Sequence, residues 1–487
     1  MSEATLSPKS SINEGVLPSF IDWSARILDK TIWFGLLAII VVAVIPYGTV
    51  DAWWEAAFEC GVFLLTALWI VESLLRGSWE VKRLSLILPL VCLTAYAFFQ
   101  TIQLPRWLAS GGVPEGSPFT LSIDPYQTFL TATKLLALTS FFGLLLLHTS
   151  TPQRLRWLVR VIMGLGMASA VFAILRQLLQ THDSGTGFVL PFLFYGVGYG
   201  QFISSNVFAF LMEMAFGMMA GLVLGGGVRR DRILIYVTMI VPVWAALVLS
   251  YSRGGILGLT CQSIFLLFVS LTWYAARRNH RENGAQANWL KFVGSSPLVR
   301  ALMIIVIVGT LVAGVLWMGG ERLSLKLAQA TSQSNEADFN PTSRTEVWHS
   351  TWELIKHNPW SGVGFGAYFL GITEYQKDAG KLRLHYAHND YLDLTASGGV
   401  IAVVLVVWFV VLIIRRARVS LRSNDAYRRA ACLGALAGLL SVSVHSFVDF
   451  GLQVTGIALV FGALIVVAVA DGRVEAIKQN EKLPQTN

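Results

Sequence analysis

The sequence predicts an all-α polytopic membrane protein with about 12 transmembrane helices and one large periplasmic loop that contains short helices. Two observations support this class. Of the 487 residues, 54% are hydrophobic and 14% are charged, whereas a soluble chain of this length carries about a quarter charged residues. The apolar residues also gather in blocks of about twenty, the length a helix needs to cross a hydrocarbon core of roughly 30 Å.

The apolar blocks predict the spans in order along the chain. They lie near residues 31–50, 54–75, 84–104, 127–148, 157–180, 202–224, 233–252, 255–276, 300–320, 388–414, 430–449 and 452–470. The chain then divides into an N-terminal tail (1–30), nine spans (31–320), a long polar segment (321–387), three spans (388–470) and a C-terminal tail (471–487). The polar N-terminus is too long for a cleaved signal peptide, so the first span is expected to be retained.

Basic residues predict the orientation of these spans. One set of alternate loops holds 20 of the 37 lysines and arginines, and the opposite short loops hold two, Arg106 and Arg253. Because positive loops stay in the cytoplasm, both termini are expected to be cytoplasmic and residues 321–387 to face outward. The net charge of +8 therefore indicates membrane orientation and no nucleic-acid partner. The four cysteines lie within apolar blocks and form no CxxC pair, which indicates neither a disulfide framework nor a zinc site.

Several cations are expected at the outer membrane surface. Arg253 lies in the tight turn LSYSRGGILG, and Lys134 and Arg176 lie inside spans near their outer ends. Ionisable residues within a membrane are costly and often mark function. Their convergence predicts a polyanionic headgroup bound there, although Lys134 and Arg176 could equally extend to lipid headgroups.

The segment NPTSRTEVWHSTWELIKHNP predicts a short helix in the outer loop. Ser343 and Glu346 have the spacing of a capping box, and Asn358-Pro359 ends the helix. Arg344, Trp348 and Trp352 recur at i, i+4 and i+8 and share one face, a combination suited to phosphate and sugar. On pattern alone, an interfacial helix with tryptophans at headgroup level is the favoured interpretation.

Three further motifs follow. The glycines of WSGVGFGAYF do not follow a predicted strand and indicate a flexible or tightly turned loop that re-enters the membrane. LHYAHNDYLDLTASGGV places His385 and His388 at the mouth of a span, where a histidine is either a general base or, more often, a capped interfacial residue. His445 and Asp449 are four residues apart and are expected to share a helix face and to hydrogen-bond, more as a packing or supporting pair than as reacting groups.

Taken in order, these motifs resemble the O-antigen ligase/polymerase superfamily of bacterial envelope glycosyltransferases. The resemblance spans roughly residues 200–470 and is carried by FISSNVFAF, SRGG, Arg344-x-x-x-Trp348 with NPWSGVGFGAYF, HNDYLDLTASGGV and HSFVDF. Each motif is weak alone, but the ordered set on a twelve-span scaffold with one large outer loop is specific.

The resemblance implies an inner-membrane glycosyltransferase that moves a glycan from undecaprenyl diphosphate to an acceptor hydroxyl at the periplasmic face, without metal or other cofactor. It implies that Arg253 and Arg344 bind the diphosphate and that His388 is the base. The acceptor would be a glycan or lipid A-core. Further candidates for substrate binding are Lys134, Arg176, Asn206, Trp348, Asn389, His445 and Asp449.

Other functions stay open at this stage. A surface-polysaccharide polymerase, a lipid A-core ligase and a protein O-oligosaccharyltransferase share these motifs, and a twelve-span transporter has the same topology. A transporter is expected to show internal repeats, broken helices and polar sites at the membrane midplane. No repeat is evident, and Glu213 is the one ionisable residue predicted near a midplane. A non-catalytic assembly scaffold would not need His388.

Overall fold

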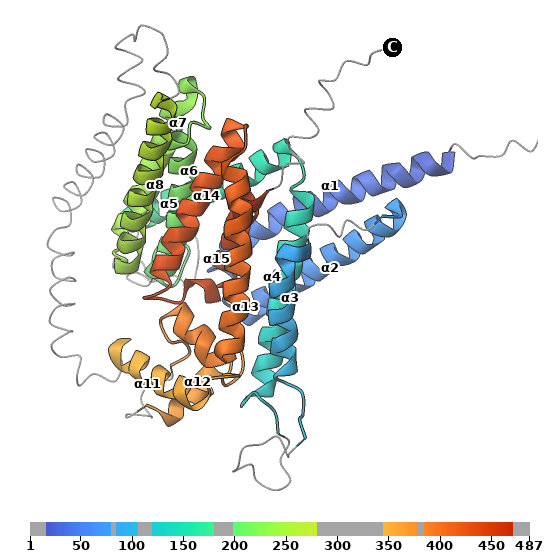
Figure 1. The fold of residues 1–487 in the computed structure, drawn as a ribbon, viewed down its shortest axis with the longest axis vertical. Coiled ribbons are helices and arrows are strands. Elements are labelled where there is room, and N and C mark those ends of the chain that lie inside the picture. Colours follow the sequence, from blue (N-terminus) through green and yellow to red (C-terminus); the bar gives the residue numbers. More distant parts are fainter. Residues whose placement is uncertain are drawn as a thin grey trace, which may run out of the picture.

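The computed structural model describes residues 16–78, 84–105, 119–179, 198–279, 344–376 and 384–470, and these residues form helices and connecting turns without a strand. The longer helices are α1 (Val16–Val44), α2 (Ala52–Arg76), α3 (Leu84–Phe99), α4 (Pro125–His148), α5 (Pro152–Leu179), α6 (Ser205–Leu224), α7 (Ile233–Leu249), α8 (Arg253–Asn279), α11 (Arg344–His357), α13 (Asp390–Leu421), α14 (Ala426–His445) and α15 (Thr455–Val469). The short helix α12 (Tyr368–Gly371) lies beside α11 at one end of the bundle (Figure 1).

The predicted class, an all-α polytopic membrane protein, is confirmed. Eight described helices are long and apolar enough to cross a membrane, and α3 and α15 are shorter apolar helices. The predicted span 300–320 lies outside the described residues. The count of twelve and the side on which each loop lies therefore stay predictions.

The first helix differs from the prediction. It begins at Val16 instead of near residue 31, so part of the expected N-terminal tail is helical. Ala25 is buried, and Asp29 pairs with Arg154 at the start of α5. Contacts with a neighbouring helix thus extend α1 beyond its apolar block, which hydropathy alone does not reveal.

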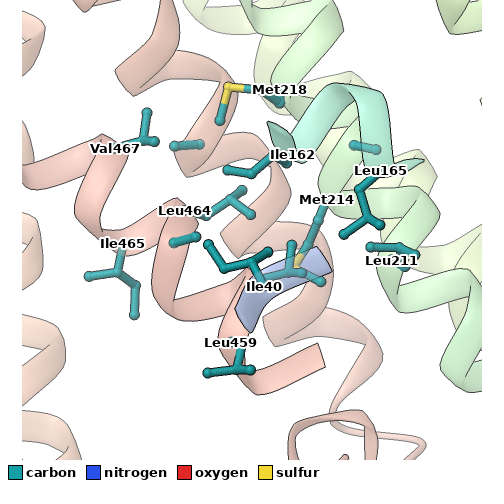
Figure 2. Packing of buried hydrophobic residues seen from close by; sticks show 14 of the residues in the cluster. Ile40, Ile162, Leu165, Leu211, Met214, Met218, Leu459, Leu464, Ile465 and Val467 are labelled. Atoms are coloured by element: carbon teal, nitrogen blue, oxygen red, sulfur yellow. The ribbon is translucent and has the colours of Figure 1, made fainter. Parts of the chain in front are cut away.

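The centre of the bundle is α6, which is buried along most of its length and packs closely on α14. Glycines make this approach possible: a Cβ added at Gly221 would lie 2.1 Å from Cα of Gly434, and one at Gly217 would lie 2.6 Å from the backbone nitrogen of Gly438. Each helix thus contributes two glycines four residues apart, a spacing that lets helix backbones meet in membranes. Side chains from α1, α5, α6 and α15 complete the core, among them Ile40 (Figure 2).

This crossing determines where the polar residues lie. Glu213 is one helical turn before Gly217, and Ser441 and His445 lie beyond Gly438 on α14. Because the backbones are in contact at the glycines, the polar side chains one to two turns away are within hydrogen-bonding reach. The α6–α14 crossing therefore places a polar cluster at the end of the bundle where α11 and α12 also lie.

Candidate functional site

The candidate site is organised by Asp449, whose carboxylate accepts contacts from several distant parts of the chain. Asp449 lies in the turn between α14 and α15, and its side chain is 6% exposed. Nδ2 of Asn206, at the start of α6, donates to Oδ2. Nη2 of Arg344, the first residue of α11, lies 3.4 Å from the same oxygen, and Nδ1 of His388 lies 3.5 Å from Oδ1. Four of the residues singled out in the sequence therefore meet at one carboxylate.

The charge of Asp449 is maintained despite its burial. Burial raises the pKa of this carboxyl, but the His388 contact and the positive charge of Arg344 hold the pKa below its usual range. The backbone N–H of Phe450 also donates to Oδ1, at 2.9 Å. Asp449 is thus a stable anion at neutral pH that faces a histidine and an arginine.

His388 itself is half-buried and lies at a bend in the backbone. Its φ of 49° is in the left-handed region, which residues with a side chain seldom adopt. Its ring meets Phe450 edge-on at 4.9 Å, and 39% of its side chain is exposed. Nδ1 faces the Asp449 carboxylate at a distance longer than a well-formed hydrogen bond. The imidazole is therefore oriented by its neighbours and still open to a substrate.

The bend at His388 is held by hydrogen bonds to the residue before it. Nε1 of Trp348 donates to the carbonyl of Ala387 at 3.1 Å, and the N–H of Ala387 donates to Oδ2 of Asp393 at 3.1 Å. A strained φ costs of order 1–3 kcal/mol and persists only where the surroundings impose it. Trp348, a candidate sugar platform in the sequence, thus also has a structural role next to His388.

Asn389 and Asp390 attach the start of α13 to the turn that carries Asp449. Asn389 caps α13 by accepting from the N–H groups of Tyr391 and Leu392, while its Nδ2 donates to the carbonyl of Phe447 at 2.9 Å. Oδ2 of Asp390 accepts from Oγ of Ser446 at 2.8 Å. His388 and Asp449 therefore belong to segments that are bonded to each other directly.

The two histidines of LHYAH are clearly different. His385 is exposed and stacks on Phe369, with ring centroids 6.0 Å apart. The contacts of His388 are instead with Asp449 and Phe450. Only the second histidine takes part in the Asp449 cluster.

The glycine-rich segment before this region is tightly turned. This is one of the two alternatives that the sequence predicted, the other being a flexible loop. The N–H groups of Val363 and Gly364 donate to the carbonyls of Ala396 and Ser397, at 2.9 Å each. Gly362, Gly364 and Gly366 all have positive φ, which only glycine adopts without strain.

The segment docks where α13 is interrupted. Gly399 has φ 62° and ψ −165°, so the helix is broken there. The N–H of Val400 donates to the carbonyl of Pro359 at 2.9 Å, and Nε2 of the buried Gln100 donates to the carbonyl of Ser361 at 2.7 Å. Backbone groups released by the break are therefore satisfied by the incoming segment.

The two remaining arginines and the lysine have different surroundings. Arg253 is exposed at the first position of α8, and the next residue, Gly254, lies against His445. Arg176 is 1% exposed and donates to the carbonyl of Gly200 at 2.8 Å.

Lys134 donates to Glu55 at 2.5 Å and to the carbonyl of Gln453 at 3.1 Å. Lys134 and Arg176 thus hold loops near the site through protein contacts. Arg106, the other cation of the loops predicted to face outward, lies outside the described residues, as does Ser343 of the expected capping box.

The predicted hydrogen bond between His445 and Asp449 is wrong. Helix α14 ends at His445, so the two residues do not share a helix face. Nδ1 of His445 instead lies 2.7 Å from Oε1 of Glu213, and its ring stacks on Phe210 at 3.8 Å. The sequence offered one signal of this pair, the isolated carboxylate within an apolar span, but not its partner.

Within the described residues, one group has the spacing to hold a metal ion: Asp29, Glu72 and His148. Both carboxylates already pair with arginines, Asp29 with Arg154 and Glu72 with Arg76 at 2.8 Å. Two guanidinium charges therefore already balance the two carboxylates. The group joins α1, α2 and α4 and contains none of the residues around Asp449.

The motifs that meet at Asp449 can now be compared with known proteins. Residues 234–407 match the O-antigen ligase family. This O-antigen ligase segment contains Arg253, Arg344 and His388, while Asn206 and Asp449 lie outside it. The resemblance read from the sequence is thereby confirmed, and it implies membrane glycosyltransferase activity of the O-antigen ligase/polymerase type, with lipid-linked glycan substrates. No curated protein matches the chain.

Proposed function

We propose that this protein is a metal-independent, inverting glycosyltransferase that moves a glycan from undecaprenyl diphosphate to an acceptor hydroxyl at the periplasmic face of the bacterial inner membrane. The observation that carries the proposal is the meeting of His388 and Arg344 at the Asp449 carboxylate. A general base and a phosphate-binding group lie there side by side, each oriented by one anion.

His388 acts as the base in this proposal. Nδ1 carries the proton that faces Asp449, because a carboxylate can only accept, and Nε2 is then free to accept the proton of the acceptor hydroxyl. The hydroxyl oxygen attacks the anomeric carbon, and the bond from that carbon to the diphosphate oxygen breaks with its electron pair leaving on the diphosphate. Attack from the face opposite the leaving group inverts the anomeric centre.

Arg344 and Arg253 stabilise the leaving diphosphate. Its charge grows as the glycosidic bond breaks, and positive groups placed in advance stabilise this charge most when water is excluded. The Arg344 side chain is 42% exposed, and one of its nitrogens lies near Asp449. A guanidinium has five N–H donors, so Arg344 can contact Asp449 and two phosphate oxygens together. No proton needs to be added to the leaving group, and the arginines supply the positive charge that a metal ion would otherwise provide.

The donor and acceptor are expected to reach the site from the outer side. We propose that 1–30 and 471–487 are cytoplasmic and that 321–387 is periplasmic and supplies the catalytic and substrate-binding elements between two groups of spans, 31–320 and 388–470. We predict that reporters fused near Gly227 and Arg418 read cytoplasmic and that a tag near Glu336 reads periplasmic, because basic loops stay in the cytoplasm. A cytoplasmic tag at Glu336 would overturn the orientation and the proposed site together.

The direct test is transfer in vitro. Purified protein is given a lipid-diphosphate glycan and, in separate reactions, a second donor molecule, lipid A-core and a protein acceptor. Growth of the lipid-linked glycan indicates a polymerase, a product on lipid A-core indicates a ligase, and a product on the polypeptide indicates a protein O-oligosaccharyltransferase. Loss of activity in His388→Ala links the product to the site.

A transporter is the alternative from another class, and among the described residues the break in α13 at Gly399 and the buried Glu213–His445 pair are features typical of it. In transporters the backbone groups at such breaks bind the substrate or ion. Here the neighbouring carbonyls of Ala396 and Ser397 accept from the N–H groups of Val363 and Gly364. The break therefore favours an anchor for the outer segment over a transport site.

A further inference from the structure

The second histidine–carboxylate pair, His445 with Glu213, has no part in the chemistry described above. The His445 side chain is 1% exposed and the Glu213 side chain 0%. Nδ1 of His445 donates to Oε1 of Glu213 at 2.7 Å, and Oγ of Ser441 donates to Oε2 at 3.0 Å. Burying such a pair costs desolvation energy, and an apolar pair of the same volume would pack without that cost. What the polar pair adds is a single, directional geometry.

His445, Ser441 and Glu213 pack directly against the first turns of α8. A Cβ added at Gly254 would lie 2.1 Å from Cδ2 and 2.4 Å from Nε2 of His445. One added at Gly258 would lie 2.6 Å from Oγ of Ser441 and 3.0 Å from Cδ of Glu213. The two glycines thus lie on one face of α8, and the imidazole and the carboxylate pack against that face.

The turn before α8 is connected to the same histidine. Oγ of Ser252 accepts from the N–H of Gly255 at 3.1 Å and so caps the helix. The same oxygen lies 3.5 Å from Nε2 of His445, the nitrogen that does not face Glu213. One face of the His445 ring stacks on Phe210, with an angle of 5° between the two ring planes. The imidazole is therefore held at both nitrogens and on one face, with its edge toward the residues on either side of Arg253.

We propose that the Glu213–His445 pair is a positioning device for Arg253, holding the first turn of α8 so that Arg253 faces the lipid diphosphate. This inference rests on the proposed diphosphate role of Arg253. Neither Glu213 nor His445 touches the substrate. They act through Gly254 and Ser252, the two neighbours of Arg253 in the chain.

The test is a double-mutant cycle between the pair and Arg253. Glu213→Gln keeps the size of the side chain and an acceptor oxygen for His445 but replaces the second carboxyl oxygen, which accepts from Ser441, with an amide donor. We expect it to raise the Kd for farnesyl diphosphate, used as a probe of the donor headgroup, and the KM for the glycan donor by about tenfold. In an Arg253→Ala background the same change is expected to add no further loss.

A second variant and a control keep the test decisive if Glu213→Gln lowers protein yield. Gly254→Ala places a methyl group against His445 without removing a polar group. It is expected to raise the Kd for farnesyl diphosphate in the same way. Gln262→Met changes another buried polar residue of α8, more than two turns from Arg253, and is expected to leave the Kd unchanged. The unfolding temperature of each detergent-solubilised variant shows whether the helix bundle is intact.

The outcomes separate this inference from the proposed function. If Arg253→Ala keeps normal Kd and turnover, the diphosphate role fails and the positioning role fails with it. If Arg253→Ala is impaired but Glu213→Gln multiplies that defect, the pair is a general packing element and only the inference is overturned. An equal effect of Gln262→Met leads to the same rejection. Loss that is absent from the Arg253→Ala background supports the positioning role.

Discussion

The protein holds two histidine–carboxylate pairs at the same end of its bundle, and their environments are opposite. His388 has 39% of its side chain exposed and lies 3.5 Å from Asp449. His445 is 1% exposed and lies 2.7 Å from Glu213. The first pair is solvent-exposed, has a long contact distance and shares its carboxylate with Arg344. The second pair is buried, has a short contact distance and packs against the backbone of α8. A base must reach a substrate and exchange a proton, so openness distinguishes the pair that we propose to react from the pair that we propose to support it.

The largest effect is expected when the open pair is broken by replacing His388. His388→Ala is predicted to lower kcat by about 10²–10⁴, the usual cost of removing a general base, while the protein stays folded and donor-bound. Single-turnover rates with saturating donor and acceptor measure the chemical step. His385→Ala is the matched control, because His385 stacks on Phe369 and is exposed. Near-normal rates in His388→Ala would remove His388 as the base.

The next change tests the cation beside the open pair. Arg344→Ala is predicted to lower kcat by about 10²-fold, and Arg344→Lys to recover only part of this loss, because an ammonium cannot make the planar two-oxygen contact. Steady-state kinetics with a lipid-diphosphate glycan give the comparison. Full activity of the lysine variant would show that charge alone is needed.

An effect of about the same size as that of Arg344→Ala is expected from the shared carboxylate. Asp449→Asn removes the anion that orients His388 and is predicted to lower kcat at the low end of about 10²–10⁴. Stability gives a second measurement. Because the pKa of Asp449 is held below its usual range in the folded protein, its contribution to stability is full above the unfolded-state pKa and is lost as pH falls through the folded-state pKa. The unfolding temperature of the asparagine variant should therefore fall less between neutral and acid pH than that of the wild type.

No change in the transfer rate is expected when divalent metal ions are removed. Chelation with EDTA is predicted to leave the transfer rate unchanged, because the proposed chemistry uses arginines in place of a cation. In the part of the chain that the structure describes, the group with ligand spacing is Asp29, Glu72 and His148, and it contains none of the residues around Asp449. Loss of transfer in EDTA, restored by one divalent ion, would show that a metal takes part.

The same comparison explains what the sequence could and could not predict. Helices were predictable because apolar blocks of membrane length have few other folds available to them. Arg344 and His388 were found through short motifs at the mouths of helices, where local spacing carries the information. The partner of His445 could not be found in this way, because Glu213 is 232 residues away and the two meet only through the glycine crossing of α6 and α14.

Contacts between helices also account for the other differences. Lys134 was a candidate for substrate binding because a buried lysine is costly, yet Glu55 supplies its counter-charge from another helix. Asp449 was read as a helical neighbour of His445, but α14 ends before it and the turn directs it toward Asn206. In each case the residue could be picked out in the sequence, but its partner depended on the tertiary fold.

The interruption of α13 has a consequence for exchanging parts between related enzymes. The glycine-rich segment and the start of α13 exchange backbone hydrogen bonds on both sides of Gly399, from Val363 and Gly364 in one direction and from Val400 in the other. A chimera that takes α11 and the glycine-rich segment from a relative, and joins it before His388, would leave these donors and acceptors facing a foreign partner. The natural cut lies after Val400, and Gln100, the residue that follows α3, must be matched to the segment because its side chain bonds to Ser361 and Ser397. The segment and the start of α13 can therefore be exchanged only as one module.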